Sequence, residues 1–196
     1  CSSKPEFTIW YGVGDQNGIM VAVQRQAAAV VVATIPLSVL QSYREGLAEE
    51  GVTSDSLGAL QHLFGIPGHH YFRGSAALWD EIIGKLLSLE GIAYETVRPS
   101  VEVITRIVIA HAEHLSKDDA PDTLGRLAVA GTERDDIIDA LGSLVGKSPV
   151  VRVYDAGRFL PTEEMRPAFV RVWMNQWTEL ILHEAKQTIG VGKDVR

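Results

Sequence analysis

The residues with the types and spacing to bind a cation are few, and the first two are an acid and an amide in one turn. Asp15 and Asn17 fall within the turn-forming segment Gly14–Gly18. Their side-chain oxygens suit Mg²⁺, but two oxygens fall short of a full coordination shell unless phosphate oxygens complete it. The same side chains commonly form local Asx turns with their own backbone. A structural turn is therefore the simpler interpretation of this pair.

Histidines form the second group that could bind a metal. His111 and His114 would share one face of a helix, but a zinc site needs a third ligand. His62, His69 and His70 are candidates only if the fold brings them close. His69 and His70 are neighbours on a predicted strand, so their side chains point to opposite faces and cannot chelate together. Solvated histidines are the simpler interpretation.

Arginines and one serine complete the set of candidates. Arg73, Arg126 and Arg134 could form an anion pocket, although arginines are mostly solvated at protein surfaces. Ser38 is the only candidate nucleophile at a strand end, and its neighbours are apolar, so no Ser-His-Asp set can be proposed. Gly12-Val13-Gly14 lacks the third glycine of a dinucleotide-binding motif. These residues alone indicate no particular reaction.

Composition predicts one globular domain. The 196 residues are 46% hydrophobic and 22% charged, which is ordinary for a domain with a sizeable core. The formal net charge is −7 and no basic patch stands out, so we expect no nucleic-acid partner. No run approaches the roughly 18 apolar residues of a membrane span. We expect a tether over residues 1–5 and a single domain over residues 6–190.

The one cysteine is residue 1, so a disulfide within the chain is impossible. A start at Cys1-Ser2-Ser3 without methionine resembles a mature bacterial lipoprotein, whose first residue carries lipid after signal-peptide removal. A truncated chain that happens to begin there is the alternative. The first interpretation predicts a protein that is anchored to a membrane through a lipidated Cys1 and lies outside the cytoplasm, in the cell envelope.

The element most able to position a site is the apolar run Ala29–Ile35, which is followed by Pro36. β-Branched residues favour a pleated sheet, and a short continuous apolar run is typical of a strand buried on both faces. Pro36 cannot donate to a strand ladder, so it should lie where the strand leaves the sheet. Ligands of α/β sheets usually bind at such carboxyl ends, which places Leu37 and Ser38 at the expected site.

Strand and helix patterns alternate along the rest of the chain and predict an α/β fold. Residues 6–13, 19–23 and 29–35 should form an antiparallel meander. Further predicted elements are helices at 57–64, 76–90, 132–144 and 163–187 and strands at 69–72 and 150–154. Residues 41–50 fit a helix or a loop, and Val101–Leu115 fits a helix or a strand. Trp173, Met174 and Trp177 are expected in the core or in a lid, with a membrane-facing role as the alternative.

The order of these elements resembles the LytR-CpsA-Psr (LCP) family of bacterial envelope proteins over roughly residues 6–145. Ile9–Asp15 resembles the family's opening strand and turn, and Asn17–Val23 its second strand. Val31–Ser38 lies where the family has a strand ending Ser-Ile-Pro-Arg-Asp. Leu60–Ile83 is the most specific match, with a helix, a Gly-Ile turn, a strand and a second helix.

The resemblance implies an α/β/α sandwich with a central mixed β-sheet, and a phosphotransferase activity. Family members move wall polymers from a polyprenyl-pyrophosphate carrier onto peptidoglycan. A tunnel buries the prenyl tail, arginines neutralise the pyrophosphate, and Mg²⁺ held by aspartates bridges its oxygens.

This sequence departs from the family where charge is needed. Leu37 and Ser38 replace the arginine and aspartate that end the central strand, and Asn17 replaces an aspartate on the metal side. Arg134 matches the arginine that opens a later helix, but the arginine-rich loop before it is missing. Leucine in place of arginine removes the positive charge, the N–H donors and their planar arrangement together, so the transfer reaction should be absent.

The favoured hypothesis is therefore an envelope lipoprotein with a degenerate LCP-like domain. It would bind a hydrophobic or polyprenyl-linked ligand, or an envelope protein partner, without catalysis and without a cofactor. The residues expected to contact the ligand are Leu37, Ser38, Arg73, Trp79 and Arg134. One alternative is a diverged phosphotransferase or pyrophosphatase that uses Mg²⁺ with Asp15, Arg73 and Arg134, and another is a purely structural module.

Overall fold

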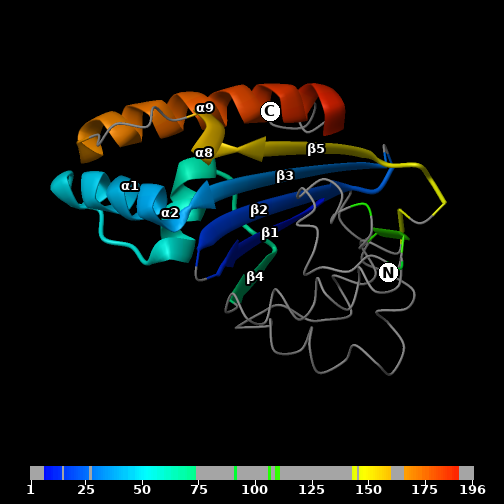
Figure 1. Ribbon diagram of the computed structural model, residues 1–196, viewed down its shortest axis with the longest axis horizontal. Coiled ribbons are helices and arrows are strands. Elements are labelled where there is room, and N and C mark those ends of the chain that lie inside the picture. Colours follow the sequence, from blue (N-terminus) through cyan, green and yellow to red (C-terminus); the bar gives the residue numbers. More distant parts are fainter. Residues whose placement is uncertain are drawn as a thin grey trace.

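The computed structural model describes residues 7–14, 16–26, 28–73, 91, 106, 109–110, 143–144, 146–159 and 166–189 (Figure 1). The predicted functional residues that lie outside this part are Cys1, Asp15, Trp79, His111, His114, Arg126 and Arg134. His70 and Arg73 are described only by their backbone. The predicted helix at 76–90 also lies outside it, as does the one at 132–144 apart from residues 143–144, which form a turn.

A mixed sheet forms the centre of the described part. Its five strands are β1 (Phe7–Val13), β2 (Asn17–Gln24), β3 (Ala29–Pro36), β4 (His70–Arg73) and β5 (Val150–Asp155). The strand order is β4-β1-β2-β3-β5, and β1, β2 and β3 form the predicted antiparallel meander. β4 pairs parallel to β1 and β5 pairs parallel to β3, so only β2 runs the other way.

Strand β3 is covered on both faces, as its apolar run predicts. Val31, Ala33 and Ile35 belong to one hydrophobic core, while Val30 and Val32 belong to the other. Pro36 is the last residue of β3, and its φ of −55° lets it serve as the N-cap of the following helix. Helix α1 (Leu37–Glu49) therefore begins directly at the strand end, and residues 41–49 prove helical.

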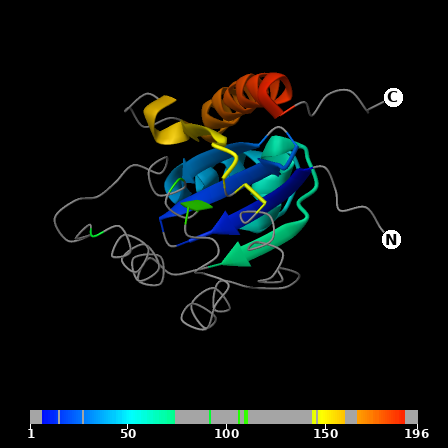
Figure 2. The same cartoon turned by 90° about the vertical axis from the view of Figure 1, so that its right-hand side faces the viewer.

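Helices α1, α2 (Ser56–Phe64) and α9 (Pro167–Ile189) pack on one face of the sheet, with α9 along α1 (Figures 1 and 2). Asp55 caps α2 by accepting a hydrogen bond from the Gly58 N–H at 2.8 Å. Gly65 ends α2 in the left-handed conformation with a φ of 66°, which glycine adopts without strain. These caps explain why α2 occupies almost the predicted residues.

The core on this face is rich in large side chains. Tyr11, Tyr43, Leu40, Leu60, Met174 and Ile181 are fully buried, and Trp177 is 3% exposed. The ring centroids of Trp177 and Phe64 lie 6.3 Å apart, so α9 and α2 meet through aromatic contact. The predicted core role of Met174 and Trp177 is confirmed, and Trp173 is half-buried.

The opposite face carries the second core. Trp10, Val23, Val30, Val32 and Val151 pack there with Ile109 and Leu144. Arg106, Ile109 and Ala110 are helical, which favours the helix over the strand for the segment left open by its pattern. Helices α1, α2 and α9 thus cover one face of a mixed sheet, and helical Ile109 packs on the other, as expected for an α/β fold. Among the helices in the described ranges, none combines the length and apolar character of a membrane span.

Candidate functional site

The ends of four parallel strands gather at one side of the sheet. β1, β3, β4 and β5 run in the same direction, so their carboxyl ends share an edge (Figure 1). The register pairs Val13 with Arg73, Pro36 with Asn17 and Thr34 with Asp155. We call this side the carboxyl edge; its described residues are 13–14, 16–17, 34–38, 73 and 155–158. It is the place where open α/β sheets usually bind ligands.

Backbone hydrogen bonds tie the strand ends at the carboxyl edge together. The Gly14 N–H donates to the Asn17 carbonyl at 2.9 Å and closes the turn between β1 and β2. The Leu37 N–H donates to the Gln16 carbonyl, also at 2.9 Å. The start of α1 is thereby fixed to the β1–β2 turn. Asn17, Leu37 and Ser38 are consequently brought together, as the sequence predicts.

Leu37 and Ser38 give this edge little charge. Leu37 is half-buried and packs against the core beneath α1, while Ser38 is exposed. The positions where the LCP resemblance implies an arginine and an aspartate therefore present an aliphatic side chain and a hydroxyl. Neither group can neutralise a diphosphate or hold Mg²⁺ by charge.

Sequence reasoning missed the charged pair at the end of β5. Asp155 accepts a hydrogen bond from the Gly157 N–H at 2.9 Å, and its second oxygen lies 3.7 Å from Nε of Arg158. Helix α8 (Ala156–Phe159) begins here and packs against the end of β3. The Asp-Ala-Gly triplet after a predicted strand was the only local sign of this turn, and the register with Thr34 is visible only in the folded chain.

His62 and His69 make structural contacts with different partners. His69 forms two hydrogen bonds with Ile9. Its backbone N–H donates to the Ile9 carbonyl at 2.9 Å, and its ring Nδ1 accepts from the Ile9 N–H at 3.1 Å. His62 lies beside Tyr43 instead. Within the described ranges, no group of three histidines, cysteines or acids could hold a metal ion.

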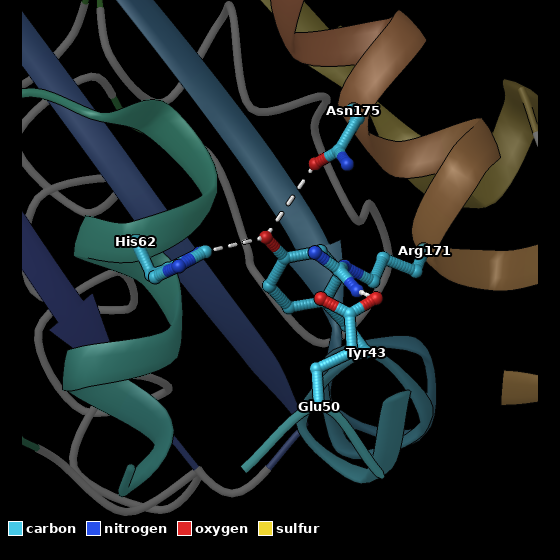
Figure 3. A network of polar contacts seen from close by, with 5 residues as sticks. All are labelled: Tyr43, Glu50, His62, Arg171 and Asn175. Carbon is cyan, nitrogen blue, oxygen red and sulfur yellow. Dashed lines mark hydrogen bonds and ion pairs between the residues drawn. The ribbon is translucent and has the colours of Figure 1, made fainter. Parts of the chain in front are cut away.

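A separate polar cluster joins α1, α2 and α9 (Figure 3). The Tyr43 hydroxyl lies 3.1 Å from Nδ1 of His62 and 3.5 Å from Oδ1 of Asn175. When Tyr43 donates to Asn175, His62 must donate to Tyr43. Arg171 forms an ion pair with Glu50 across the end of α1, and its Nε is buried without a partner in the part of the chain described. The cluster links three helices that cover one core.

Burial of Tyr43 makes the stability of the layer formed by α1, α2 and α9 decrease at alkaline pH. Burial raises the pKa of its hydroxyl above the usual value near 10, and the Arg171 charge partly offsets this. Since the folded-state pKa is the higher one, the contribution is complete below about pH 10 and is lost as the pH rises further. We expect the free energy of unfolding, measured with urea from about pH 9 to 11.5, to fall less steeply in Tyr43→Phe than in the wild type. Equal slopes would contradict this role of Tyr43.

Comparison with known proteins supports the fold. No family model matches the sequence, and no curated protein matches it. The solved structure of Lin1025 from Listeria innocua aligns with a TM-score of 0.56 and 14% identity, over 98% of this chain and 100% of that chain. TagT bound to LIIa-WTA aligns with a TM-score of 0.58 and 12% identity, over 97% and 95%. The transcriptional regulator yvhJ from Bacillus subtilis aligns with a TM-score of 0.51 and 10% identity, over 91% and 99%.

These similarities concern the fold, because the identities are low. The structural likeness extends over almost the whole chain, beyond the roughly 140 residues that carry the sequence resemblance. The chain therefore has an LCP-like fold.

Proposed function

We propose that this protein binds a hydrophobic or polyprenyl-linked ligand at the carboxyl edge, in the cell envelope, and does not transfer its phosphoryl group. The observation that carries the proposal is Leu37, which stands half-buried at the end of β3 where the LCP resemblance implies arginine. The LCP-like fold supports the ligand class, since TagT is described bound to LIIa-WTA.

Phosphoryl transfer at the carboxyl edge depends on cations more strongly than binding of a prenyl chain does. Transfer depends on cations that neutralise charge developing on the phosphoryl oxygens, and losing one donor of such a site typically costs about 10²–10³ in rate. An apolar ligand is held mainly by burial of its surface, for which leucine is suited. Replacement of arginine by leucine therefore removes catalysis more completely than binding.

Mg²⁺ does not fit the described donor set of this edge. Asp155 is the one described carboxylate there, and its oxygens already face the Gly157 N–H and Arg158. Asn17 adds an amide oxygen, and two such groups do not form a magnesium shell. A diverged Mg²⁺-dependent phosphotransferase or pyrophosphatase is the second candidate function, favoured only by the carboxylate of Asp155 beside Thr34.

One assay separates the two functions. Incubation of the full chain with a polyprenyl pyrophosphate and Mg²⁺ is expected to release no phosphate above the protein-free rate, because Leu37 supplies no charge. Native mass spectrometry of protein purified from membranes is expected to show a bound prenyl lipid. Phosphate release that requires Mg²⁺ would overturn the non-catalytic proposal in favour of the enzyme.

Anchoring through Cys1 stays a prediction of the same proposal. Intact mass measurement of the membrane-purified protein should give a mass above that of the chain by the mass of the attached lipid, and Cys1→Ser should remove the difference. An unmodified Cys1 would remove the anchor from the proposal and leave ligand binding to be decided by the assay above. A stable protein partner without any bound lipid would instead favour the structural module.

A further inference from the structure

Binding of a diphosphate headgroup at the carboxyl edge requires a cation that strand β3 no longer supplies. Two of the described cations are already engaged elsewhere. Arg44 donates to the Ser54 carbonyl at 3.0 Å, and Arg171 pairs with Glu50. Neither is available to a ligand at the strand ends without breaking these contacts.

Other described cations lie away from the carboxyl edge. Arg25 follows the end of β2, the one strand that runs toward the opposite edge. Lys147 precedes the start of β5, and Arg106 donates to the Pro149 carbonyl at the same end. Arg152 lies within β5, in register with Val31 and not with the strand end. Arg73 ends β4 at the carboxyl edge, but it is described only by its backbone. Arg158 is the cation whose side chain is described at this edge.

The position of Arg158 follows from the contacts of its own turn. Asp155 ends β5 in register with Thr34, two residues before Pro36. A Cβ added to Gly157 would lie 3.3 Å from Cγ of Pro36, so the turn touches the last residue of β3. Arg158 is the next residue, and its side chain is 87% exposed. Its guanidinium therefore stands in solvent beside the β3–α1 junction.

We infer that Arg158 binds the phosphate oxygens of the ligand and provides, from helix α8 directly after β5, the cation that Leu37 does not provide at the end of β3. The inference rests on the proposed function. The ion pair with Asp155 is long and exposed, and such pairs contribute little. Phosphate offers a guanidinium two parallel charge-assisted hydrogen bonds, which are stronger. The Asp155 carboxylate is thus a weak competitor that phosphate displaces from Arg158.

Titration calorimetry of the full chain with farnesyl diphosphate tests this role. Arg158→Ala is expected to weaken the affinity about tenfold, because a charge-assisted contact is lost. Arg152→Ala is the matched control, since it removes an exposed arginine within β5, away from the carboxyl edge, and its affinity should equal that of the wild type. Farnesol should bind wild type and Arg158→Ala equally, because it lacks the diphosphate. Arg158 is exposed, so the variant should keep the wild-type melting temperature.

Asp155→Asn provides a test with the opposite sign. The amide oxygen can still accept the hydrogen bond from Gly157, while the negative charge that competes with phosphate is removed. The affinity for farnesyl diphosphate is expected to rise about two- to threefold. A merely structural Asp155–Arg158 pair would instead give both variants the same effect.

The outcomes separate this inference from the function beneath it. Wild-type binding of farnesyl diphosphate that Arg158→Ala leaves unchanged would overturn the role of Arg158 and leave the proposed function standing. No wild-type binding of either prenyl compound would overturn the proposed function, and the role of Arg158 with it. Inorganic pyrophosphate that binds as tightly as farnesyl diphosphate, and loses affinity in Arg158→Ala, would support Arg158 while overturning the lipid-linked ligand.

Discussion

Tyr11→Ala is expected to lower the free energy of unfolding by about 3–5 kcal/mol, as truncation of a buried aromatic residue does. Tyr11 has no exposed surface, and its ring lies 6.0 Å from Phe64 and 6.2 Å from Tyr71 between centroids. A Cβ added to Gly68 would lie 2.6 Å from Cδ2 of Tyr11, so the backbone is packed directly on the ring. Removal of the ring would leave a cavity between β1, α2 and the start of β4.

Tyr11→Phe separates the ring from its hydroxyl. The hydroxyl donates to the Ile66 carbonyl at 2.7 Å, and its loss should cost about 1 kcal/mol. Val52→Ala, at a position with 38% exposure, should change stability by less than about 0.5 kcal/mol. Urea unfolding of the three variants gives the comparison. A loss below about 1 kcal/mol in Tyr11→Ala would contradict the packing of β1 against α2.

The meander was predictable because its interactions are local and its pattern is unambiguous. Val30, Val31 and Val32 follow one another without a polar break, and only a strand covered from both sides buries such a run. The parallel partners were not predictable in the same way. β5 joins β3 across more than 110 residues, and no feature of the run Val150–Asp155 specifies which strand it meets.

Asn17-Gly18 shows how a strong local pattern can mislead. The dipeptide suggests a hairpin turn, yet Asn17 is the first residue of β2 and Gly18 pairs with both Val13 and Ile35. A Cβ added to Gly18 would lie 3.2 Å from methyl groups of Leu40 and Leu60. A side chain at this position would therefore crowd the two helices that pack on the strand, which is a tertiary constraint that the sequence does not display.

The residues of the candidate site likewise include some that the sequence predicted and some that it did not. Leu37, Ser38 and Asn17 were predicted at the strand ends because each follows or precedes a recognisable strand. Asp155 and Arg158 were missed because their relation to the site exists only through the β3–β5 register. A cation that follows β5 cannot be related to the end of β3 by a residue-by-residue comparison with a family pattern.

The difference between a positive and a negative charge introduced at position 37 is expected to be the largest functional effect. Leu37→Arg would place a guanidinium at the β3–α1 junction and should tighten binding of farnesyl diphosphate about tenfold. Leu37→Glu would place a like charge beside the phosphates and should weaken binding about tenfold, so the two variants should differ about a hundredfold. Both lose the same half-buried aliphatic contact, so their difference reports charge at this position.

Leu37→Met serves as the matched control, because it keeps the volume and apolar character and should retain wild-type affinity. Val52→Arg and Val52→Glu repeat the charge reversal at an exposed position in the loop between α1 and α2, where the effect should vanish. The same calorimetric titration measures all five variants. If Leu37→Arg and Leu37→Glu bind farnesyl diphosphate equally, the phosphates do not lie at the end of β3. This result would argue against the carboxyl edge as the binding site, because Leu37 lies at the end of its central strand β3.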